Sequence, residues 1–450
     1  MRNKLPCVTV RNQRLKEEYR LYRHPSGLDI YVYPKDMRTT YALFGAKYGS
    51  IHNLIPAEDG SMTQTVPDGI AHFLEHKLFA SEDGSDAFER FSDYGADANA
   101  YTSFNKTCYL FSCTDRLEES LSELLEFVTH PYFTEESVAS EIGIISEEIH
   151  MYEDNPSDRC FYGMLEAMYQ KHSVRRNICG SVSSISQITP QLLYQCYDAF
   201  YRLSNMALVV CGNVSDEQIL QVANRLLPSL PAKPPLATAN ENEGESEAVY
   251  QPYVEYTMQV AKPIFNIGFK DTRIPRGGEE RQRRDAAMSI LDEMLFSRSG
   301  SFYQSLIEQD LISPAFSYGY NLSRTVAYHS LAGESEDPKK VMELLWSFLD
   351  EVRKNGLSKE DFELGKRVMY AEFVKSFDST ESIANNLFSF ICEEGDLLSY
   401  QSTLEQITFD EVCRLFEDAF APHTAALSVV YPISKNSNET NEQENLLWKK

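Results

Sequence analysis

Short runs of apolar residues and longer segments with helical spacing alternate along the chain. Residues 28–33 alternate in character, with Leu28, Ile30 and Val32 on one face, and Pro34 ends the run. Alternation of this kind is typical of a strand that is buried on one side. The same criteria predict further strands at 107–113 and 207–211 and helices at 117–128 and 135–152. Because strands and long helices are interleaved, the pattern predicts an α+β fold in which helices cover a sheet.

The two halves of the chain resemble each other weakly. Three pairs of segments align in the same order: 73–79 with 290–296, Thr134 with Ser358 as caps that open a helix, and 207–210 with 426–429. Their offsets of 217, 224 and 219 residues differ by at most seven. Each match alone is weak, but three in order predict a duplicated fold of two similar domains, each with helices on a sheet.

A segment rich in proline and acidic residues, 231–250, divides the chain near its middle. Such a segment cannot bury a core, so we expect it to be an extended and solvated linker. The expected domains are therefore 1–230 and 251–433. The polar tail at 434–450 has the same character as the linker, and we expect it to be disordered.

Length and charge narrow the classes of function. A chain of 450 residues is too long for one compact core, and 42 Lys and Arg against 67 Asp and Glu give a net charge of −25. Such a surface repels nucleic acid and anionic lipid and attracts cationic peptides. No signal peptide or membrane-spanning run is evident, and the nine cysteines are scattered singly, as is typical of reduced thiols. We expect a cytoplasmic protein that binds neither nucleic acid nor membrane.

One segment combines residues with metal chemistry, His72-x-x-Glu75-His76. Asp68 is expected to cap a helix here, and on that helix His72 and His76 project from one face, one turn apart. Two imidazoles at this separation can bind one zinc ion. Glu75 lies beside them and is the candidate general base. The alternative interpretation is two ordinary histidines on a helix face.

A second predicted helix carries a candidate third ligand. Glu141 and Glu148 are seven residues apart and therefore share a face, which we expect to include the apolar Ile144 and Ile145. A carboxylate on a buried face needs a partner, and a metal ion is a suitable one. Glu148 would be the ligand, and Glu141 would orient an imidazole. The alternative is that both glutamates lie on an exposed flank.

The motif at residues 72–76, followed by Glu148, resembles the insulinase/pitrilysin family of zinc peptidases, in the short bacterial form that is related to mitochondrial processing peptidase. Residues 95–102 are similar to the family's substrate-pairing edge strand, and 201–214 to the end of its first domain. The resemblance implies a catalytic domain at 1–230, an inactive homologous domain at 251–433 and one Zn²⁺ per chain.

The resemblance also implies the activity. The expected function is an endopeptidase that cleaves short or unfolded peptides inside a closed chamber made of two half-clamshell chains. General peptide turnover and trimming of a leader peptide both fit. The peptide is expected to pair with the edge strand at Asn99, Ala100 and Thr102. Two other functions remain open: a noncatalytic structural or binding subunit of a peptidase complex, and a metal-dependent hydrolase of small molecules.

The second half departs from the catalytic pattern. Ser289 and Glu293 stand in place of the two histidines, and Asp292 stands in place of Glu75. These residues are unsuited to bind zinc. Family members often carry an Arg and a Tyr here that hold the substrate backbone. The alignment puts Ser301 and Phe316 at those positions. A shift of the alignment by two or three residues would instead put Arg298 and Tyr318 there. We therefore expect a heterodimer with a homologous subunit that lacks the zinc motif, and a homodimer remains an alternative.

Overall fold

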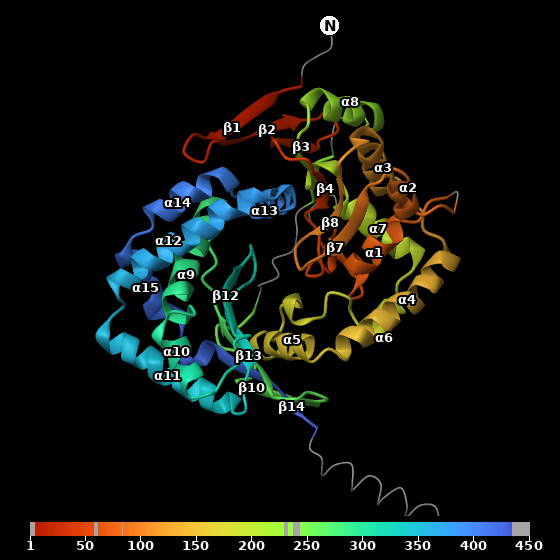
Figure 1. Cartoon of the computed structure of the whole chain (residues 1–450). Coiled ribbons are helices and arrows are strands. Elements are labelled where there is room, and N and C mark those ends of the chain that lie inside the picture. The colour runs from red at the N-terminus through yellow and green to blue at the C-terminus, as the bar shows by residue number, and fades with distance from the viewer. Residues whose placement is uncertain (1–4, 58–61, 83, 229–232, 237–243, 434–450) are drawn as a thin grey trace, which may run out of the picture.

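The computed structural model describes residues 5–57, 62–82, 84–228, 233–236 and 244–433. Its strands form two large sheets in separate lobes and one short hairpin (Figure 1). In spatial order the first sheet consists of β1 (Cys7–Asn12), β2 (Glu17–Arg23), β3 (Asp29–Pro34), β9 (Met206–Gly212), β4 (Thr40–Ala46), β8 (Thr107–Cys113) and β7 (Asp97–Thr102). The second consists of β10 (Tyr253–Met258), β14 (Ala425–Pro432), β11 (Ile264–Lys270), β13 (Ala327–Glu334) and β12 (Ser317–Leu322). The hairpin pairs β5 (Leu54–Pro56) with β6 (Met62–Thr65).

The two sheets repeat one topology. The order β3-β9-β4-β8-β7 in the first corresponds to β10-β14-β11-β13-β12 in the second. Directions match as well, because β3 and β9 are parallel, as are β10 and β14, and the other neighbours in both series are antiparallel. The duplicated α+β fold expected from the sequence is therefore confirmed.

Helices surround both sheets. Those of the first half are α1 (Ile70–Leu78), α2 (Ala87–Asp93), α3 (Leu117–Thr129), α4 (Glu135–Glu153), α5 (Pro156–Met168), α6 (Val182–Ile185), α7 (Pro190–Phe200) and α8 (Asp216–Leu226). Those of the second half are α9 (Gly278–Phe296), α10 (Ser301–Glu308), α11 (Pro338–Asn355), α12 (Lys359–Lys375), α13 (Thr380–Cys392), α14 (Tyr400–Gln406) and α15 (Phe409–Ala419). As expected, Thr134 and Ser358 cap α4 and α12. Among the described residues, no helix combines the length and the apolarity needed to cross a membrane.

Each half contributes one helix to the other half's sheet. Helix α5 packs on β11 and β14 of the second sheet, and α13 packs on β4 and β9 of the first (Figure 1). Both contacts are close because the strand has a glycine there. A Cβ atom at Gly45 would lie 2.2 Å from the ring of Phe388, and one at Gly268 would lie 2.8 Å from Met164. The exchange ties the two halves into one body.

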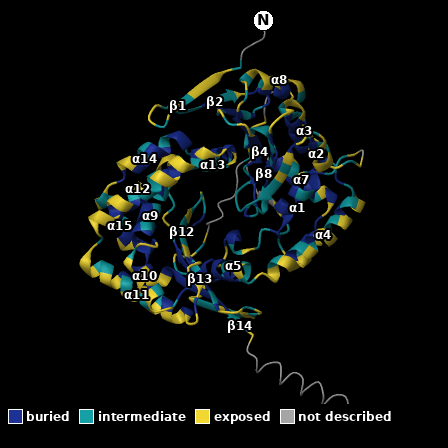
Figure 2. Ribbon diagram, viewed as in Figure 1, coloured by how far each residue is buried: buried dark blue, intermediate teal, exposed yellow. Residues whose placement is uncertain are grey.

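This exchange explains a difference from the sequence-based expectation. β3 is buried on both faces rather than one. Leu28, Ile30 and Val32 belong to the core inside the first half, whereas Tyr31 and Tyr33 belong to a core shared with the second half. Outer helices such as α4 and α11 expose one side, while the central strands are buried (Figure 2). The pattern of alternation identified the strand but not what covers its second face.

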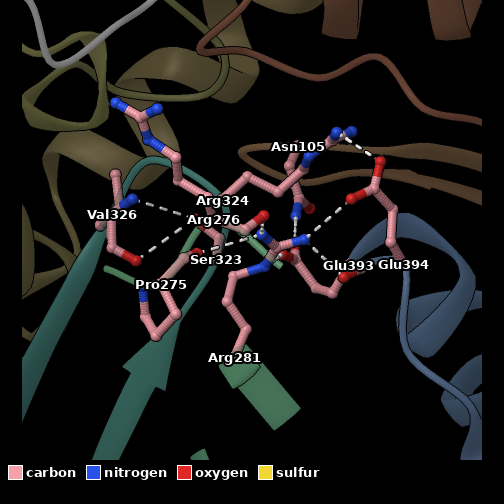
Figure 3. A network of polar contacts seen from close by, with 9 residues as sticks. All are labelled: Asn105, Pro275, Arg276, Arg281, Ser323, Arg324, Val326, Glu393 and Glu394. Atoms are coloured by element: carbon pink, nitrogen blue, oxygen red, sulfur yellow. Dashed lines mark hydrogen bonds and ion pairs between the residues drawn. The ribbon is translucent and has the colours of Figure 1, made fainter. Parts of the chain in front are cut away.

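A polar network also joins the halves (Figure 3). Asn105, between β7 and β8, donates a hydrogen bond of 2.7 Å to Glu393 at the end of α13. The buried Arg281 of α9 donates to the backbone oxygen of Glu393 at 2.6 Å. Arg324, after β12, bonds Glu394 at 2.6 Å. The turn after α13 is therefore held from both sheets.

The described part of the linker is not solvated throughout. Residues 229–232 and 237–243 and the tail at 434–450 lie outside the described residues. The side chain of Glu245, however, is 4% exposed and forms an ion pair of 2.7 Å with Lys270 of β11. The expectation of a solvated linker is wrong at this residue, because a buried lysine and three backbone N–H groups surround its carboxylate.

Candidate metal centre

Helix α1 begins at Ile70, and Asp68 does not cap it. The residue at the cap position is Gly69, which has φ +91° and makes no side-chain cap. Asp68 instead accepts two hydrogen bonds from the guanidinium of Arg176, at 2.6 and 2.8 Å. The expected cap is therefore wrong, because the Asp68 carboxylate accepts both hydrogen bonds from Nη1 of Arg176, 108 positions away in the sequence.

The structure brings the two histidines and Glu148 together. The rings of His72 and His76 lie 4.5 Å apart, as their spacing on α1 predicts. Glu148 on α4 faces both rings: its Oε1 lies 3.6 Å from His72 Nε2, and its Oε2 lies 3.5 Å from His76 Nε2. Three potential ligand side chains from two helices therefore come together, with each imidazole facing a different oxygen of Glu148.

The arrangement suits a zinc ion. Ligand nitrogen and oxygen atoms at about 2.0–2.2 Å from a tetrahedral zinc ion lie about 3.3–3.6 Å from one another. The distances from Glu148 to both imidazoles agree with this separation and are long for hydrogen bonds. His72 is buried, and its Nδ1 has no hydrogen-bond partner within the described residues. The residues present fit the metal that the sequence predicted.

Glu141 lies behind the histidines. Its Oε1 is 3.1 Å from His76 Nδ1, and its Oε2 is 3.4 Å from the ammonium group of the buried Lys77. Burial alone would raise the pKa of Glu141, but the hydrogen bond with His76 and the charge of Lys77 outweigh it and lower that pKa. A carboxylate that accepts the Nδ1 proton leaves Nε2 free to bind a metal.

The expected apolar face of α4 is only half right. Ile145 is fully buried, but Ile144 is 56% exposed and borders the cavity beside the histidines. Glu141 and Glu148 point toward α1. Ile144, between them, faces the cavity rather than the core. Glu141 is held by His76 and Lys77, and Glu148 faces the two imidazoles, so the polar partners of both glutamates lie on α1.

Glu75 is buried beside the cluster and touches the edge strand. Its Oε2 accepts a hydrogen bond of 2.6 Å from Thr102 Oγ1 on β7. Burial raises the pKa of Glu75 above its ordinary value, and the imidazoles of His72 and His76 counteract part of this. A carboxylate with a raised pKa close to a metal cluster is suited to accept and return a proton.

All these groups line one cavity of about 790 Å³. β7 borders the cavity with Asn99, Ala100 and Thr102, and it is the last strand of its sheet. The backbone N–H of Ala100 donates to the Asn99 side chain at 2.8 Å. Described carboxylates line the cavity at five positions: Glu75, Asp86, Glu141, Glu148 and Asp158. The site is thus acidic and lies next to an unpaired sheet edge.

The corresponding region of the second half is arranged differently. Asp292 is buried and lies 2.7 Å from His329 Nδ1, and Glu293 accepts a hydrogen bond of 2.6 Å from the hydroxyl of Tyr318. Phe316 is buried, and Arg298 bonds the backbone oxygen of Pro314. Among the described residues, the group of three side chains whose potential ligand atoms all lie within 4.8 Å of one another is in the first half and contains His72, Glu148 and Cys179; His76 is outside this group and reaches the cluster through Glu148 Oε2, at 3.5 Å.

Sequence reasoning missed two residues of this centre. Lys77 was not singled out, although its buried ammonium group contacts Glu141. Cys179 was expected only to be a reduced thiol like the other cysteines, but its Sγ lies 3.9 Å from His72 Nε2. Lys77 could have been found, since a charged residue interrupts the apolar side of α1. Cys179 lies 107 positions from His72, and no local pattern links the two.

Comparisons with known proteins agree with this architecture. Residues 57–182 match the domain model of insulinase (peptidase family M16), and residues 187–369 match that of the peptidase M16 inactive domain. The chain is 38% identical to the uncharacterized zinc protease YmfH of Bacillus subtilis over 94% of this chain and 99% of that protein.

Solved structures show the same fold. A crystal structure from Alicyclobacillus acidocaldarius, described as M16-like, is 32% identical and has a TM-score of 0.87, covering 95% of this chain and 100% of that one. The periplasmic protease PqqL of Escherichia coli shares the fold at 19% identity and a TM-score of 0.69, over 97% of this chain and 50% of that one. The duplicated fold, the matched domains and the identity to YmfH show that the chain belongs to the insulinase family of peptidases, M16.

Proposed function

We propose that the chain is a zinc endopeptidase that cleaves short or unfolded peptides. The observation that carries this proposal is the convergence of His72, His76 and Glu148 beside the buried carboxylate of Glu75, in a cavity bordered by a free sheet edge. Two imidazoles and a carboxylate are a common ligand set of catalytic zinc sites. The names of the related zinc proteases support the same metal.

The residues have distinct tasks. His72, His76 and Glu148 would hold one zinc ion per chain, and Glu141 would fix the orientation of the His76 ring. Zinc, when bound, would polarise the scissile carbonyl and lower the pKa of a water molecule. Glu75 would take a proton from the attacking water and return it to the leaving amine. Thr102, which donates to Glu75 Oε2, would hold this carboxylate in place.

The peptide would bind as an added strand beside β7. Extended peptides add to free sheet edges through main-chain hydrogen bonds, which require little of the sequence. The N–H of Ala100 bonds the Asn99 side chain, and a peptide carbonyl could replace that side-chain oxygen. The five carboxylates of the cavity and the net charge of −25 favour cationic peptides. Peptide turnover and leader trimming would both use this geometry.

A second subunit would close the chamber. We infer that the partner is a homologous chain without the zinc motif, because the substrate-holding Arg and Tyr of the family correspond here to Ser301 and Phe316. Phe316 is buried, and the nearby Tyr318 is engaged by Glu293. Without the pair, the substrate would be poorly held, at a cost of the order of 10²-fold in rate.

The zinc assignment is tested by substituting Glu75 and the ligands separately. Glu75→Gln should retain about one zinc per chain and lose peptide cleavage, because the ligands stay and the base is lost. His76→Ala and Glu148→Gln should lose the metal. Glu147→Gln is a matched control for Glu148→Gln on α4, since Glu147 is exposed. Peptide cleavage by Glu75→Gln at the wild-type rate would refute the proposed mechanism.

The partner is tested by adding the homologous chain. The isolated chain, loaded with zinc, should cleave peptides weakly, and a homologue with the Arg–Tyr pair should raise the rate about 10²-fold without adding metal. Full activity of the isolated chain would contradict the heterodimer. Zinc binding with no cleavage by either preparation would favour a noncatalytic subunit instead.

A further inference from the structure

Cys179 faces the same centre as the proposed zinc ligands. Its Sγ lies 3.9 Å from His72 Nε2, and the ligand atoms of His72, Glu148 and Cys179 all lie within 4.8 Å of one another. The side chain is 5% exposed, and it lines the cavity that contains Glu75. A sulfur ligand from a third segment, the loop before α6, therefore approaches the cluster that α1 and α4 form.

The loop that carries Cys179 is seated tightly on the start of α1. A Cβ atom at Gly69 would lie 2.4 Å from the backbone oxygen of Cys179, and one at Gly180 would lie 2.4 Å from that of Asp68. Gly180 has φ +75°, which favours glycine. The two hydrogen bonds from Arg176 to Asp68 fasten the loop at its other end. The backbone thus sets the position of Sγ relative to His72.

The distance is compatible with a shared metal. A thiolate at about 2.3 Å and an imidazole nitrogen at about 2.0–2.1 Å from a tetrahedral zinc ion lie about 3.6 Å apart. The observed 3.9 Å is close to this value, so a small change in the Cys179 side chain would suffice. A thiol that coordinates zinc is deprotonated outright, and its negative charge is then balanced by the metal.

We propose that Cys179 supplies a fourth ligand to the metal when no peptide is bound. The resting centre would then contain His72, His76, Glu148 and Cys179, and the thiolate would occupy the position that water needs for hydrolysis. Four protein ligands are typical of closed zinc sites, whereas catalytic sites keep one position open. Cys179 would therefore restrain the centre until a peptide and water displace it. This inference rests on the zinc centre proposed above.

Cobalt substitution tests the ligand without an activity assay. The purified full-length chain is loaded with Co²⁺ in place of zinc, and its absorption spectrum and metal content are measured without peptide. A thiolate ligand gives a charge-transfer band in the near ultraviolet. The wild type should show this band, and Cys179→Ala should bind Co²⁺ and lose it. Cys413→Ala, at a partly buried thiol in the second half, is the matched control and should keep it.

The outcomes separate this inference from the zinc assignment. Bound Co²⁺ without the band in the wild type would overturn the role of Cys179 and leave the zinc peptidase proposal intact. A band that survives in Cys179→Ala would overturn it equally. Failure of the wild type to bind Co²⁺ or Zn²⁺ would refute both. If Cys179→Ala does not fold, X-ray absorption of the zinc-loaded wild type decides, because one sulfur at about 2.3 Å is expected and its absence refutes the inference.

Discussion

Replacing Glu245 by Gln should loosen the attachment of the linker to the second sheet. All acceptor positions of the Glu245 carboxylate are occupied. Oε1 accepts from Lys270 Nζ at 2.7 Å and from the backbone N–H of Gln170 at 3.0 Å. Oε2 accepts from the N–H groups of Lys171 at 2.7 Å and His172 at 2.9 Å. An amide has one acceptor oxygen, so its NH₂ group would face donors.

The expected loss is about 3 kcal/mol. Removing one partner of a buried ion pair typically costs about 3–5 kcal/mol, because the other charge remains buried and unpaired. Lys270 is 1% exposed, and its other described hydrogen bond goes to the backbone oxygen of Met168 at 3.3 Å. That bond offsets part of the loss. The lower end of the range therefore applies.

The effect should also depend on pH. Burial alone would raise the pKa of Glu245, but the hydrogen bonds from Lys270 and three backbone N–H groups outweigh it and lower the pKa to about 2. A depressed pKa stabilises the fold above the ordinary glutamate value of about 4.3, and this stabilisation disappears as the pH falls toward about 2. Wild type and variant should differ fully at pH 7 and converge in acid.

Urea unfolding at pH 7 and pH 3 measures both effects. Glu247→Gln is the matched control, because the side chain of Glu247 is 60% exposed and the imidazole of His423 is 4.0 Å away. A substitution there should change the stability by less than about 0.5 kcal/mol. If Glu245→Gln shifted the first midpoint of urea unfolding no more than Glu247→Gln does, the claim that Glu245 attaches the linker to the second sheet would be refuted.

Three further predictions follow from the packing and the charge. Gly45→Ala should destabilise the chain by about 1–3 kcal/mol in urea unfolding, because the added Cβ would lie 2.2 Å from Phe388, whereas Gly143→Ala, in open space, should be harmless. Burial raises the pKa of Glu393 to about 7, so the stability of the fold should fall as the pH rises from about 4.3 through 7 and this buried carboxyl loses its proton, and Glu393→Gln should remove this dependence of the melting temperature. Raising salt from about 0.05 M to about 0.5 M should weaken the capture of cationic peptides, and equal turnover of matched acidic and basic peptides at low salt would contradict the charge argument.

The fold was largely predictable because the spacing of apolar residues along the chain identifies the helices and strands. The strand expected at 107–113 is β8 (Thr107–Cys113), and the helix expected at 135–152 is α4 (Glu135–Glu153). The duplication followed from three weak matches in the same order, whose offsets differ by at most seven residues. The exchange of α5 and α13 between the sheets was not predictable, because an apolar helix face does not specify which sheet covers it.

The site was predictable where the spacing within one helix, or the family resemblance, indicated its residues. His72 and His76 share a helix face because of their spacing, and their rings do lie 4.5 Å apart. Glu148 was expected from the helix face that it shares with Glu141 and from the family resemblance. The contacts of Cys179 with His72 and of Thr102 with Glu75 join separate elements, and periodicity within one element carries no information on such pairs.

Comparison with the second half shows which contacts in the first half are specific to its candidate metal centre. In both halves a carboxylate of the central helix accepts a hydrogen bond of 2.6 Å from a hydroxyl on the edge strand, Glu75 from Thr102 and Glu293 from Tyr318. The two bonds involve different positions, because Glu293 corresponds to His76 and Asp292 to Glu75, but the bond in the second half shows that such a contact does not by itself indicate catalysis. What distinguishes the first half is the pair of imidazoles facing Glu148. Substituting the histidines should consequently abolish metal binding while leaving the bond between Glu75 and Thr102, and hence the fold of the edge, in place.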